Sequence, residues 1–394
     1  MPFSPQSLHR RAKKFLLRND LDLFIPVLPS LERVAADEIR DMGRDIRVVH
    51  GGVELRGDLS SIYELNLQVR AGNYVLLRLG RFLSQSYPML YDHARHIDWA
   101  AILGNCPEFS IHVTSRASRL NHKSKARSVI FDAICDRLAS GGHRPLLVNN
   151  GVLAVHARIH MDRCTLSLNT TGDHLHKRGY RRLVSVAPIR ETTAAGLLLV
   201  AASRTYDVLI DPFCGTGTFA IEADQIARDC PPGLRREFAI ENSPLHAAGI
   251  MRHAKRLVMA GCLDHSTQTI IGSDVSAAVV EAANQNARYA GARGIRFQVS
   301  DALALDFSKL APPHAKGLIV SNLPYGKRLG TPSSARSLIE DFCERVAHAA
   351  RGWDFALLTP RELPIRHPGL IVDNEFALIN SGVPVTFTLG HVPT

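Results

Sequence analysis

The residues best suited to chemistry in this 394-residue chain begin with a glycine-rich turn in its second half. An apolar segment, Val208–Ile210, ends at Asp211 and continues as Pro-Phe-Cys-Gly-Thr-Gly-Thr. Gly215 and Gly217 allow a sharp bend and a close approach of the backbone to a ligand. A helix that begins near Thr218 would point its free N–H groups at that ligand. The turn lacks both the P-loop lysine and the GxGxxG dinucleotide fingerprint, so it predicts a ligand site of another kind.

The string from Asp211 to Thr218 resembles motif I of class I S-adenosylmethionine-dependent methyltransferases, which hold the methionine end of their cofactor there. The resemblance implies S-adenosylmethionine as the methyl donor. Within the string, Cys214 invites comparison with the nucleophile of RNA cytosine-5 methyltransferases. Those enzymes place their cysteine at the end of a later strand, where this chain has Asn322-Leu-Pro-Tyr. We therefore expect Cys214 to line the cofactor pocket.

Two further acidic residues follow the next two expected strands. Asp274 comes after Ile270–Ser273, and Asp301 comes shortly after Ile295–Val299. An acid at the first place can accept hydrogen bonds from both ribose hydroxyls of a nucleoside. An acid at the second can accept one from an adenine amino group. Each acid alone is more often a helix N-cap, but three acids after three successive strands favour a cofactor site.

The segment Ser321-Asn-Leu-Pro-Tyr-Gly326 resembles the Asn/Asp-Pro-Pro-Tyr motif of methyltransferases that act on exocyclic amino nitrogens, with Leu323 in place of the first proline. Such a nitrogen is a poor nucleophile because its lone pair is spread into the ring. The Asn322 side-chain oxygen and the Leu323 carbonyl can accept its two hydrogens, and the Tyr325 ring can stack on the base. Positioning and electrostatics then replace a strong general base. The predicted catalytic residues are Asn322, Leu323, Pro324 and Tyr325.

The elements that must position these residues are of two kinds. Residues 185–394 alternate apolar strands with helices, which predicts a parallel sheet covered on both faces and a ligand site at the carboxyl ends of its strands. Residues 22–170 mix helices and strands in an order that fits ferredoxin-like or related α/β units. In this first part we expect helices at 31–42, 62–69 and 128–138 and strands at 24–28, 53–55, 74–81, 109–114, 152–160 and 164–169.

The charge of the chain is strongly asymmetric. Lys and Arg number 47 and Asp and Glu 37, which gives a net charge of +10. Residues 1–190 hold 28 basic and 17 acidic side chains, whereas residues 191–394 hold 19 and 20. On charge alone, the first half faces either nucleic acid or an anionic membrane.

A base-modifying site favours the phosphates of RNA as the partner of this basic half. Tyr180, within a basic cluster where the two halves join, is expected either to stack on a base or to pack at the junction. The predicted RNA-binding residues are Lys13, Lys14, Arg116, Arg119, Lys123, Lys125, Lys177, Arg178, Arg181, Arg182, Lys327 and Arg328.

Composition argues against several other classes of protein. The seven cysteines form no CxxC pair, so neither a disulfide framework nor a metal site is expected, and a reducing cytosol fits them. We find no signal peptide. The longest apolar run, Ala194–Ala202, is far shorter than the ~20 residues that span a bilayer. These features predict a cytoplasmic, monomeric protein without membrane or metal.

The chain as a whole, from about residue 22 to 392, resembles bacterial THUMP-domain RNA guanine-N2 methyltransferases, and within them the large-subunit rRNA enzymes. The segments that carry the resemblance are 31–43, 51–58, Leu175-His-Lys-Arg-Gly-Tyr-Arg181 and Ala187-Pro-Ile-Arg-Glu-Thr192. The last is similar to the motif that closes over the cofactor. With it, the implied cofactor-binding residues are Thr192, Asp211, Pro212, Cys214, Gly215, Gly217, Asp274, Asp301, Ala302 and Asn322.

The resemblance implies an α/β protein in three parts. These are a basic N-terminal extension at 1–21, ferredoxin-like and THUMP α+β domains at 22–172, and a Rossmann-like class I methyltransferase domain at 173–394. The chain is then expected to lack the second methyltransferase domain of some fused relatives.

The implied activity is methylation of N2 of a guanine in structured RNA, with 23S rRNA favoured. Three alternatives stay open on the sequence: the same reaction on tRNA, adenine-N6 methylation of RNA, and a non-catalytic RNA-binding assembly factor. The intact acids and glycines of the cofactor site argue against the last.

Overall fold

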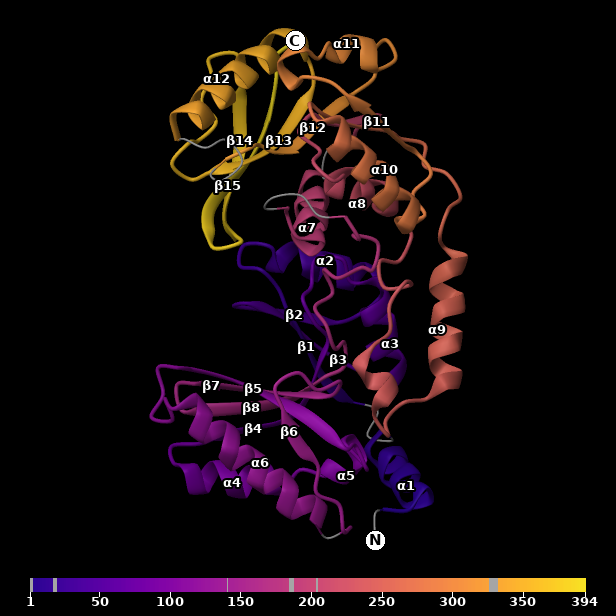
Figure 1. The fold of residues 1–394 in the computed structure, drawn as a ribbon, viewed down its shortest axis with the longest axis vertical. Helices are drawn as coiled ribbons and strands as arrows, with labels where there is room; N and C mark the ends of the chain where they lie inside the picture. The colour runs from indigo at the N-terminus through magenta and orange to yellow at the C-terminus, as the bar shows by residue number, and fades with distance from the viewer. Residues whose placement is uncertain (1–2, 17–19, 140, 184–187, 203–204, 326–331) are drawn as a thin grey trace. The chain divides into compact units, whose positions relative to one another are not determined.

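The computed structural model describes residues 3–16, 20–139, 141–183, 188–202, 205–325 and 332–394, and Figure 1 traces its elements. The chain divides into two compact units. The N-terminal unit comprises Met1–Pro26, Ala36–Leu175 and Arg236–Leu257. The C-terminal unit comprises Val27–Ala35, His176–Arg235 and Val258–Thr394. Part of the second half of the sequence, Arg236–Leu257, thus belongs with the N-terminal unit, which no sequence pattern indicates.

The N-terminal unit is built on an eight-stranded sheet in the order β2-β3-β1-β4-β8-β7-β5-β6. In β1, side chains alternate between buried and half-buried, because successive residues of a strand point to opposite faces. The strands are β1 (Leu21–Pro26), β2 (Ile46–Val49), β3 (Gly52–Gly57), β4 (Leu76–Leu83), β5 (Glu108–Arg116), β6 (Leu146–Val148), β7 (Ala154–His160) and β8 (Arg163–Asn169).

The helices of this unit are α1 (Pro5–Leu16), α3 (Leu59–Gln68), α4 (Tyr87–Arg95), α5 (Trp99–Ile102) and α6 (Lys123–Ala139), with a short 3-10 helix, η1 (Ala239–Asn242). Two further helices, α2 (Glu32–Asp41) and α9 (Ala248–Ala260), have residues in both units. A capping box starts α3, in which the Asp58 carboxylate accepts the Ser61 N–H at 2.9 Å. Helix α6 begins five residues before the predicted start, so Lys123 and Lys125 lie in its first turn.

The C-terminal unit contains a seven-stranded sheet in the order β11-β10-β9-β12-β13-β15-β14. The first five strands in this order are parallel, while β15 runs antiparallel to β13 and to β14. The strands are β9 (Val208–Asp211), β10 (Thr269–Asp274), β11 (Ile295–Val299), β12 (Gly317–Asn322), β13 (Asp354–Pro360), β14 (Ile371–Asn380) and β15 (Val383–His391). The predicted Rossmann-like domain is confirmed.

Helices connect these strands, and the central strands are the most buried. Every residue of β9 and of β12 is buried, as expected for parallel strands covered on both faces. Ile210, Ile319, Phe342 and Phe355 lie in one hydrophobic cluster between the sheet and its covering helices. The helices are α7 (Glu191–Ala201), α8 (Thr218–Ala227), α10 (Ala277–Ala290), η2 (Ala302–Ala304), α11 (Phe307–Leu310) and α12 (Pro332–Ala349).

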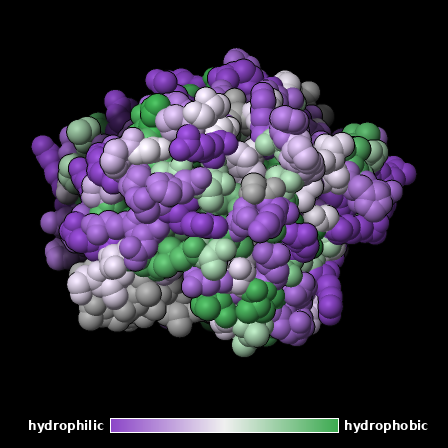
Figure 2. All heavy atoms as spheres, turned by 90° about the horizontal axis from the view of Figure 1, so that it is seen from above, coloured by the Kyte–Doolittle hydropathy of each residue, from purple (hydrophilic) through white to green (hydrophobic). Residues whose placement is uncertain are grey.

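The spacing of the cysteines predicted no disulfide framework, yet the structure contains one disulfide. Cys230 and Cys262 form a disulfide with their Cα atoms 4.6 Å apart, a single pair that the spacing of the cysteines did not reveal. Among the described residues, no cluster of histidine, cysteine and acidic side chains could hold a metal ion. In the same part of the chain, no helix is both long and apolar enough to cross a membrane. Figure 2 shows one face, where polar residues predominate and apolar ones gather only in small groups.

Candidate active site

The predicted site residues meet at the carboxyl ends of three neighbouring strands. Asp211 ends β9, Asp274 ends β10 and Asn322 ends β12. Because β9 lies between β10 and β12 with all three parallel, these side chains share one edge of the sheet. A switch in strand order at this point is where open α/β sheets bind ligands.

Asp211 links the glycine-rich turn to the catalytic segment. Its carboxylate Oδ1 accepts a hydrogen bond of 2.6 Å from the Ser321 hydroxyl and one of 3.3 Å from the Phe213 N–H. Asp211 and Ser321 are both almost completely buried. The predicted cofactor-binding acid therefore also fixes the residue that precedes Asn322.

The glycine-rich turn has the backbone geometry that the sequence predicted. Gly215 and Gly217 both adopt positive φ, at 52° and 86°. A Cβ atom on Gly217 would lie 2.9 Å from the Phe297 ring, so only glycine fits there. The Gly215 N–H donates to Asp274 Oδ2 at 3.2 Å, while Asp274 Oδ1 accepts the Ser276 N–H at 3.0 Å. Asp274 therefore shapes the turn as well as ending its strand.

A small cavity of about 20 Å³ lies between the glycine-rich turn and Asn322. Four predicted cofactor-binding residues line it: Asp211, Cys214, Gly215 and Asn322. Its other lining residues are Pro188, Ile189, Phe213, Thr216, Thr218 and Phe219. The remaining predicted cofactor-binding residues, Thr192, Pro212, Gly217, Asp274, Asp301 and Ala302, do not line it. Of these, Asp301 is exposed and caps η2 by accepting the Leu303 N–H at 2.9 Å.

Asn322 carries an acceptor with no partner in the described part of the chain. Its side chain is 5% exposed, it lines the cavity, and its Oδ1 makes no hydrogen bond to any described residue. A buried polar atom without a partner costs free energy unless a ligand satisfies it. The site therefore fits a ligand that brings a hydrogen-bond donor to Asn322.

The neighbours of Asn322 in the catalytic segment are fixed by β13 and β14. The Leu323 N–H donates to the Leu358 carbonyl at 3.1 Å. The hydroxyl of Tyr325 accepts a hydrogen bond of 2.9 Å from the side-chain amide of Asn380, at the end of β14. Asn380 is a site residue that the sequence analysis missed, because nothing local in its sequence marks it.

Cys214 lines the cavity as expected. Its thiol is buried, and this burial, with the nearby charges of Asp211 and Asp274, raises its pKa well above the ordinary value. The thiol therefore stays protonated at neutral pH and is a poor nucleophile.

Arg178 and Arg181 were predicted to bind RNA, and the structure corrects this prediction. Arg178 is 2% exposed and lies 3.5 Å from the buried Glu222, which also accepts a hydrogen bond of 2.9 Å from the Tyr180 hydroxyl. Arg181 pairs with buried Glu191 at 3.2 Å. Both arginines thus neutralise buried carboxylates, and Tyr180 packs instead of stacking on a base. Glu222 lies 44 residues beyond Arg178, so the local sequence gives no sign of that pair.

Arg181 also braces the wall of the cavity. Its Nη2 donates to the Ile189 carbonyl at 2.6 Å and to the Thr218 hydroxyl at 2.9 Å. Ile189 and Thr218 both line the cavity, from the segment before α7 and from the first turn of α8. The side chain therefore joins two walls of the site.

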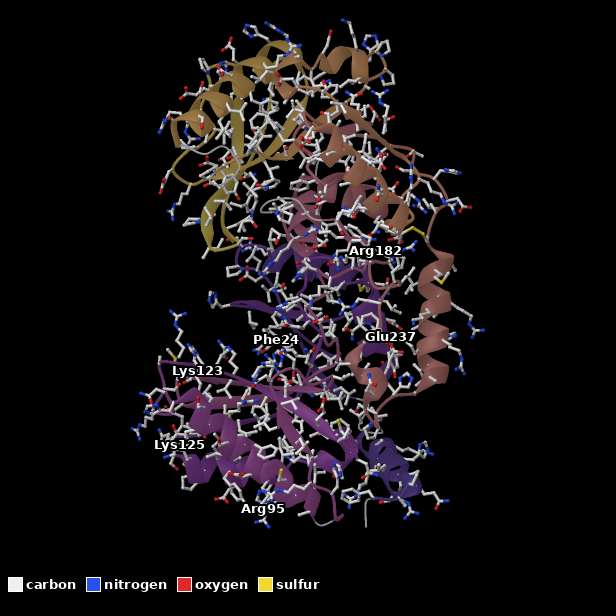
Figure 3. All side chains as sticks on the ribbon, in the orientation of Figure 1. Phe24, Arg95, Lys123, Lys125, Arg182 and Glu237 are labelled. Carbon is white, nitrogen blue, oxygen red and sulfur yellow. A yellow bond between two sulfur atoms is a disulfide. The ribbon has the colours of Figure 1, made fainter. Side chains whose placement is uncertain are left out.

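Eight of the remaining predicted RNA contacts are exposed: Lys13, Lys14, Arg116, Arg119, Lys123, Lys125, Lys177 and Arg182. Figure 3 shows Lys123 and Lys125 pointing outward from α6. Some of these side chains also have neighbours within the fold. Arg119 lies 3.6 Å from Asp162, Lys125 lies over the Tyr87 ring, and Arg182 lies over the Tyr289 ring. Lys327, Arg328 and the start of the segment at 187 lie outside the described residues.

Comparison with known proteins agrees with this geometry. Three family models match consecutive parts of the chain: an RlmL ferredoxin-like domain at residues 22–76, a THUMP domain at 84–169 and an RMKL-like methyltransferase domain at 178–366. The chain therefore contains a ferredoxin-like domain, a THUMP domain and a methyltransferase domain of these families. It is thus an enzyme, and S-adenosylmethionine is its methyl donor, as the sequence predicts.

Relatives of this THUMP-domain methyltransferase match along most of its length. It is 29% identical over 368 residues to slr0064, a candidate RNA methyltransferase of Synechocystis, covering 92% of this chain and 94% of that protein. It is 31% identical over 350 residues to the ribosomal RNA large subunit methyltransferase K/L of Methylococcus capsulatus. That match covers 86% of this chain and 47% of the relative, so the chain spans about half the length of the K/L enzymes.

Solved structures show the same fold. A candidate methylase from Clostridium difficile superposes with a TM-score of 0.83 at 28% identity, covering 95% of this chain and 99% of that one. SMU.472, a candidate methyltransferase crystallised with S-adenosylhomocysteine, superposes with a TM-score of 0.82 at 25% identity over the same shares.

Proposed function

We propose that this protein methylates the exocyclic N2 amino group of a guanine in 23S rRNA. The observation that carries the proposal is the buried, unpartnered Oδ1 of Asn322 in a cavity beside the glycine-rich turn. An amino group of a nucleobase is a donor that this acceptor lacks. The K/L relatives, whose names assign them to large-subunit rRNA, support the choice of RNA.

S-adenosylmethionine, when bound, supplies an electrophilic methyl group on a sulfonium. The methionine end of this cofactor would be held by the residues that line the cavity, Asp211, Cys214, Gly215 and Asn322. Its nucleoside part would contact two acids, Asp274 at the end of β10 and Asp301 after β11. Thr192, Pro212, Gly217 and Ala302 would complete the surroundings of the cofactor.

The chain's own contribution to the reaction is to place the amino nitrogen. Asn322 Oδ1 and the Leu323 carbonyl would accept its two hydrogens, and the Tyr325 ring would stack on the base. Asn380 restrains that ring by donating to its hydroxyl. A fixed geometry of this kind raises the rate without a strong base. A base inside a duplex cannot reach such a pocket, so the target guanine would be unpaired or turned out of its helix.

The exposed basic residues of the N-terminal unit support RNA as the partner. Arg116, Lys123 and Lys125 lie on β5 and in the first turn of α6, within the residues matched by the THUMP model. Their phosphate contacts would hold the RNA by its backbone and shape rather than by its sequence. We further propose that the protein is a monomer that acts in the cytoplasm. In its sequence, the RNA-binding part would end at residue 172 and the catalytic part would begin at residue 173.

The test is methylation of purified 23S rRNA and, separately, of tRNA with labelled cofactor, followed by analysis of the nucleosides. N2-methylguanosine in 23S rRNA is expected. The Asn322→Ala variant should lose at least about 2.7 kcal/mol of transition-state stabilisation, a hundredfold in rate, while binding the cofactor almost normally. Label in tRNA would show that tRNA is the substrate instead, and label on adenine N6 would show that a different base is methylated. A near-normal rate in the variant would contradict the role of Asn322.

A further inference from the structure

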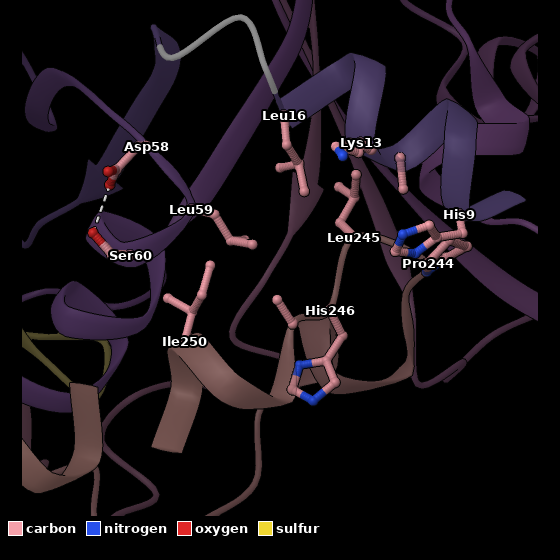
Figure 4. Close-up of a pocket in the computed structure, with 12 residues that line it drawn as sticks. His9, Lys13, Leu16, Asp58, Leu59, Ser60, Pro244, Leu245, His246 and Ile250 are labelled. Atoms are coloured by element: carbon pink, nitrogen blue, oxygen red, sulfur yellow. Dashed lines mark hydrogen bonds between the residues drawn. The ribbon is translucent and has the colours of Figure 1, made fainter. Parts of the chain in front are cut away.

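A second cavity lies in the N-terminal unit and contains none of the residues assigned to the active site. It measures about 290 Å³ and is formed by α1, the first residues of α3 and the segment that leads into α9 (Figure 4). Its floor is apolar, because Ala12, Leu59 and Leu245 line it and are at most 6% exposed. Its volume is close to the lower end of pockets that hold small organic ligands, roughly 300 Å³.

Polar groups surround this floor and are available for a ligand. Lys13 and His9 reach the rim from α1, and neither has an ion pair or hydrogen bond within the described residues. Asp58 Oδ1 accepts from Ser60 and Ser61, whereas Asp58 Oδ2 has no described partner. Burial by itself would raise the pKa of Asp58, but the hydrogen bonds from these serines outweigh that effect. The pKa therefore lies below its ordinary value, and the carboxylate remains ionised.

His246 offers an imidazole nitrogen at the same rim. The Tyr63 hydroxyl accepts the Ala247 N–H at 2.8 Å and lies 3.0 Å from His246 Nδ1. This contact occupies Nδ1 and leaves Nε2 of His246 without a partner among the described residues. The cavity thus combines a cation, a carboxylate acceptor and two imidazole rings above an apolar floor.

Helix α1 is a fixed wall of this cavity. Arg11 pairs with Asp98 at 3.1 Å, and the Asn105 side chain donates to the Phe3 carbonyl at 2.8 Å. Gly104 also packs closely against the opposite wall, since a Cβ there would lie 2.5 Å from Pro244. These contacts hold the basic N-terminal segment as an ordered part of the N-terminal unit.

Two of the helices at this cavity, α1 and α9, carry only positive charge. Neither α1 nor α9 contains an acidic residue. Arg10, Lys14, Arg252, Lys255 and Arg256 have no ion pair within the described residues. Like charges three or four positions apart, such as Arg252 and Arg256, destabilise a helix. A polyanion would relieve that repulsion.

We propose that this cavity binds one unpaired nucleotide of RNA, with its base on the apolar floor and its phosphates toward Lys13 and the basic helices. The proposal rests on the proposed function, because it takes RNA as the substrate. Single-stranded nucleotides are recognised through base stacking on rings and through hydrogen bonds to base edges, and the cavity offers both kinds of contact. It would act as a second, non-catalytic contact that selects RNA with an unpaired segment.

The test measures the affinity of the full-length protein for a labelled ten-nucleotide single-stranded RNA and for a duplex of equal length. Ile250→Trp fills the mouth of the cavity, while Leu257→Trp makes a similar change on an exposed site of α9 outside it. Lys13→Glu and Lys14→Glu form a second pair, because only Lys13 lines the cavity. Ile250→Trp should weaken single-strand binding about fivefold to tenfold and leave duplex binding unchanged. Leu257→Trp should change neither.

Lys13→Glu should weaken single-strand binding more than Lys14→Glu does. Equal effects within either pair of variants, or an equal loss of affinity for single strand and duplex, would overturn the proposal. Failure of the wild-type protein to methylate 23S rRNA would refute the proposed function instead. Normal methylation together with an Ile250→Trp variant of unchanged affinity would refute the nucleotide pocket alone.

Discussion

The Ser321 hydroxyl donates to Asp211 Oδ1 across 2.6 Å, joining residues 110 positions apart in the sequence. One belongs to the predicted cofactor motif and the other to the predicted catalytic segment. Because both are buried, this hydrogen bond locks the two strand ends together and sets the position of Asn322 relative to the glycine-rich turn.

Ser321→Ala should therefore lower both stability and cofactor affinity. Removing one partner of a buried, charged hydrogen bond costs about 1–3 kcal/mol. Urea denaturation and calorimetric titration with cofactor would measure the two effects. Ser337→Ala is the matched control, since Ser337 makes a hydrogen bond of 3.3 Å to Asp341 on the exposed side of α12. Equal losses in the two variants would show that Ser321 has no special role.

Asn380→Ala should reduce turnover with little change in cofactor affinity. Without this amide, the Tyr325 hydroxyl loses its donor at 2.9 Å and the ring is less restrained. A neutral hydrogen bond contributes about 0.5–1.5 kcal/mol, so we expect a rate loss of about twofold to tenfold. Tyr325→Phe should cost a similar amount, and the double variant no more than either single one. Additive losses would mean that the two residues act independently.

Arg181→Ala should weaken cofactor binding about tenfold and leave RNA affinity unchanged, because Arg181 braces Ile189 and Thr218. Arg182→Ala is the neighbouring control and should leave cofactor affinity unchanged. The Arg182 side chain is exposed, so its loss should weaken RNA binding and flatten the dependence of that binding on salt. Arg181→Lys keeps the charge but loses the planar fork, and should resemble the alanine variant. Loss of RNA affinity in Arg181→Ala would restore the original prediction for this residue.

Glu191 should make stability depend on pH. Burial raises its pKa to about 7 from an ordinary 4.5, although the charge of Arg181 opposes the shift. Between these values the native protein holds a proton that the unfolded chain releases, so the free energy of unfolding should fall as pH rises from about 4.5 to about 7. Glu191→Gln removes this titration. Urea denaturation of both proteins at several pH values should show their difference changing across that window, and parallel curves would argue against a raised pKa.

Local patterns were sufficient for the strand ends and their motifs. Asp211, Gly215, Gly217 and Asn322 were predicted from residue type and spacing, because a strand, a glycine turn and a helix are encoded by neighbouring residues. The start of α6 was missed because its first residues are mostly polar. Helices α4 and α9 were also missed, although both carry apolar residues at helical spacing and could have been predicted from it. Asn380 was missed for a different reason, as its partner Tyr325 lies 55 residues away.

By itself, the sequence determined the kind of chemistry, because the residue types that bind a cofactor or an amino group occur in short contiguous segments. It also determined the excess of positive charge in the first half. Only the tertiary structure decided which basic residues remain exposed to RNA. Arg178 meets buried Glu222, 44 residues away, and Arg181 meets buried Glu191, whereas Arg182 remains at the surface. A charge in a sequence has no fixed partner until folding brings an opposite charge within a few ångströms, and burial then makes that pairing obligatory.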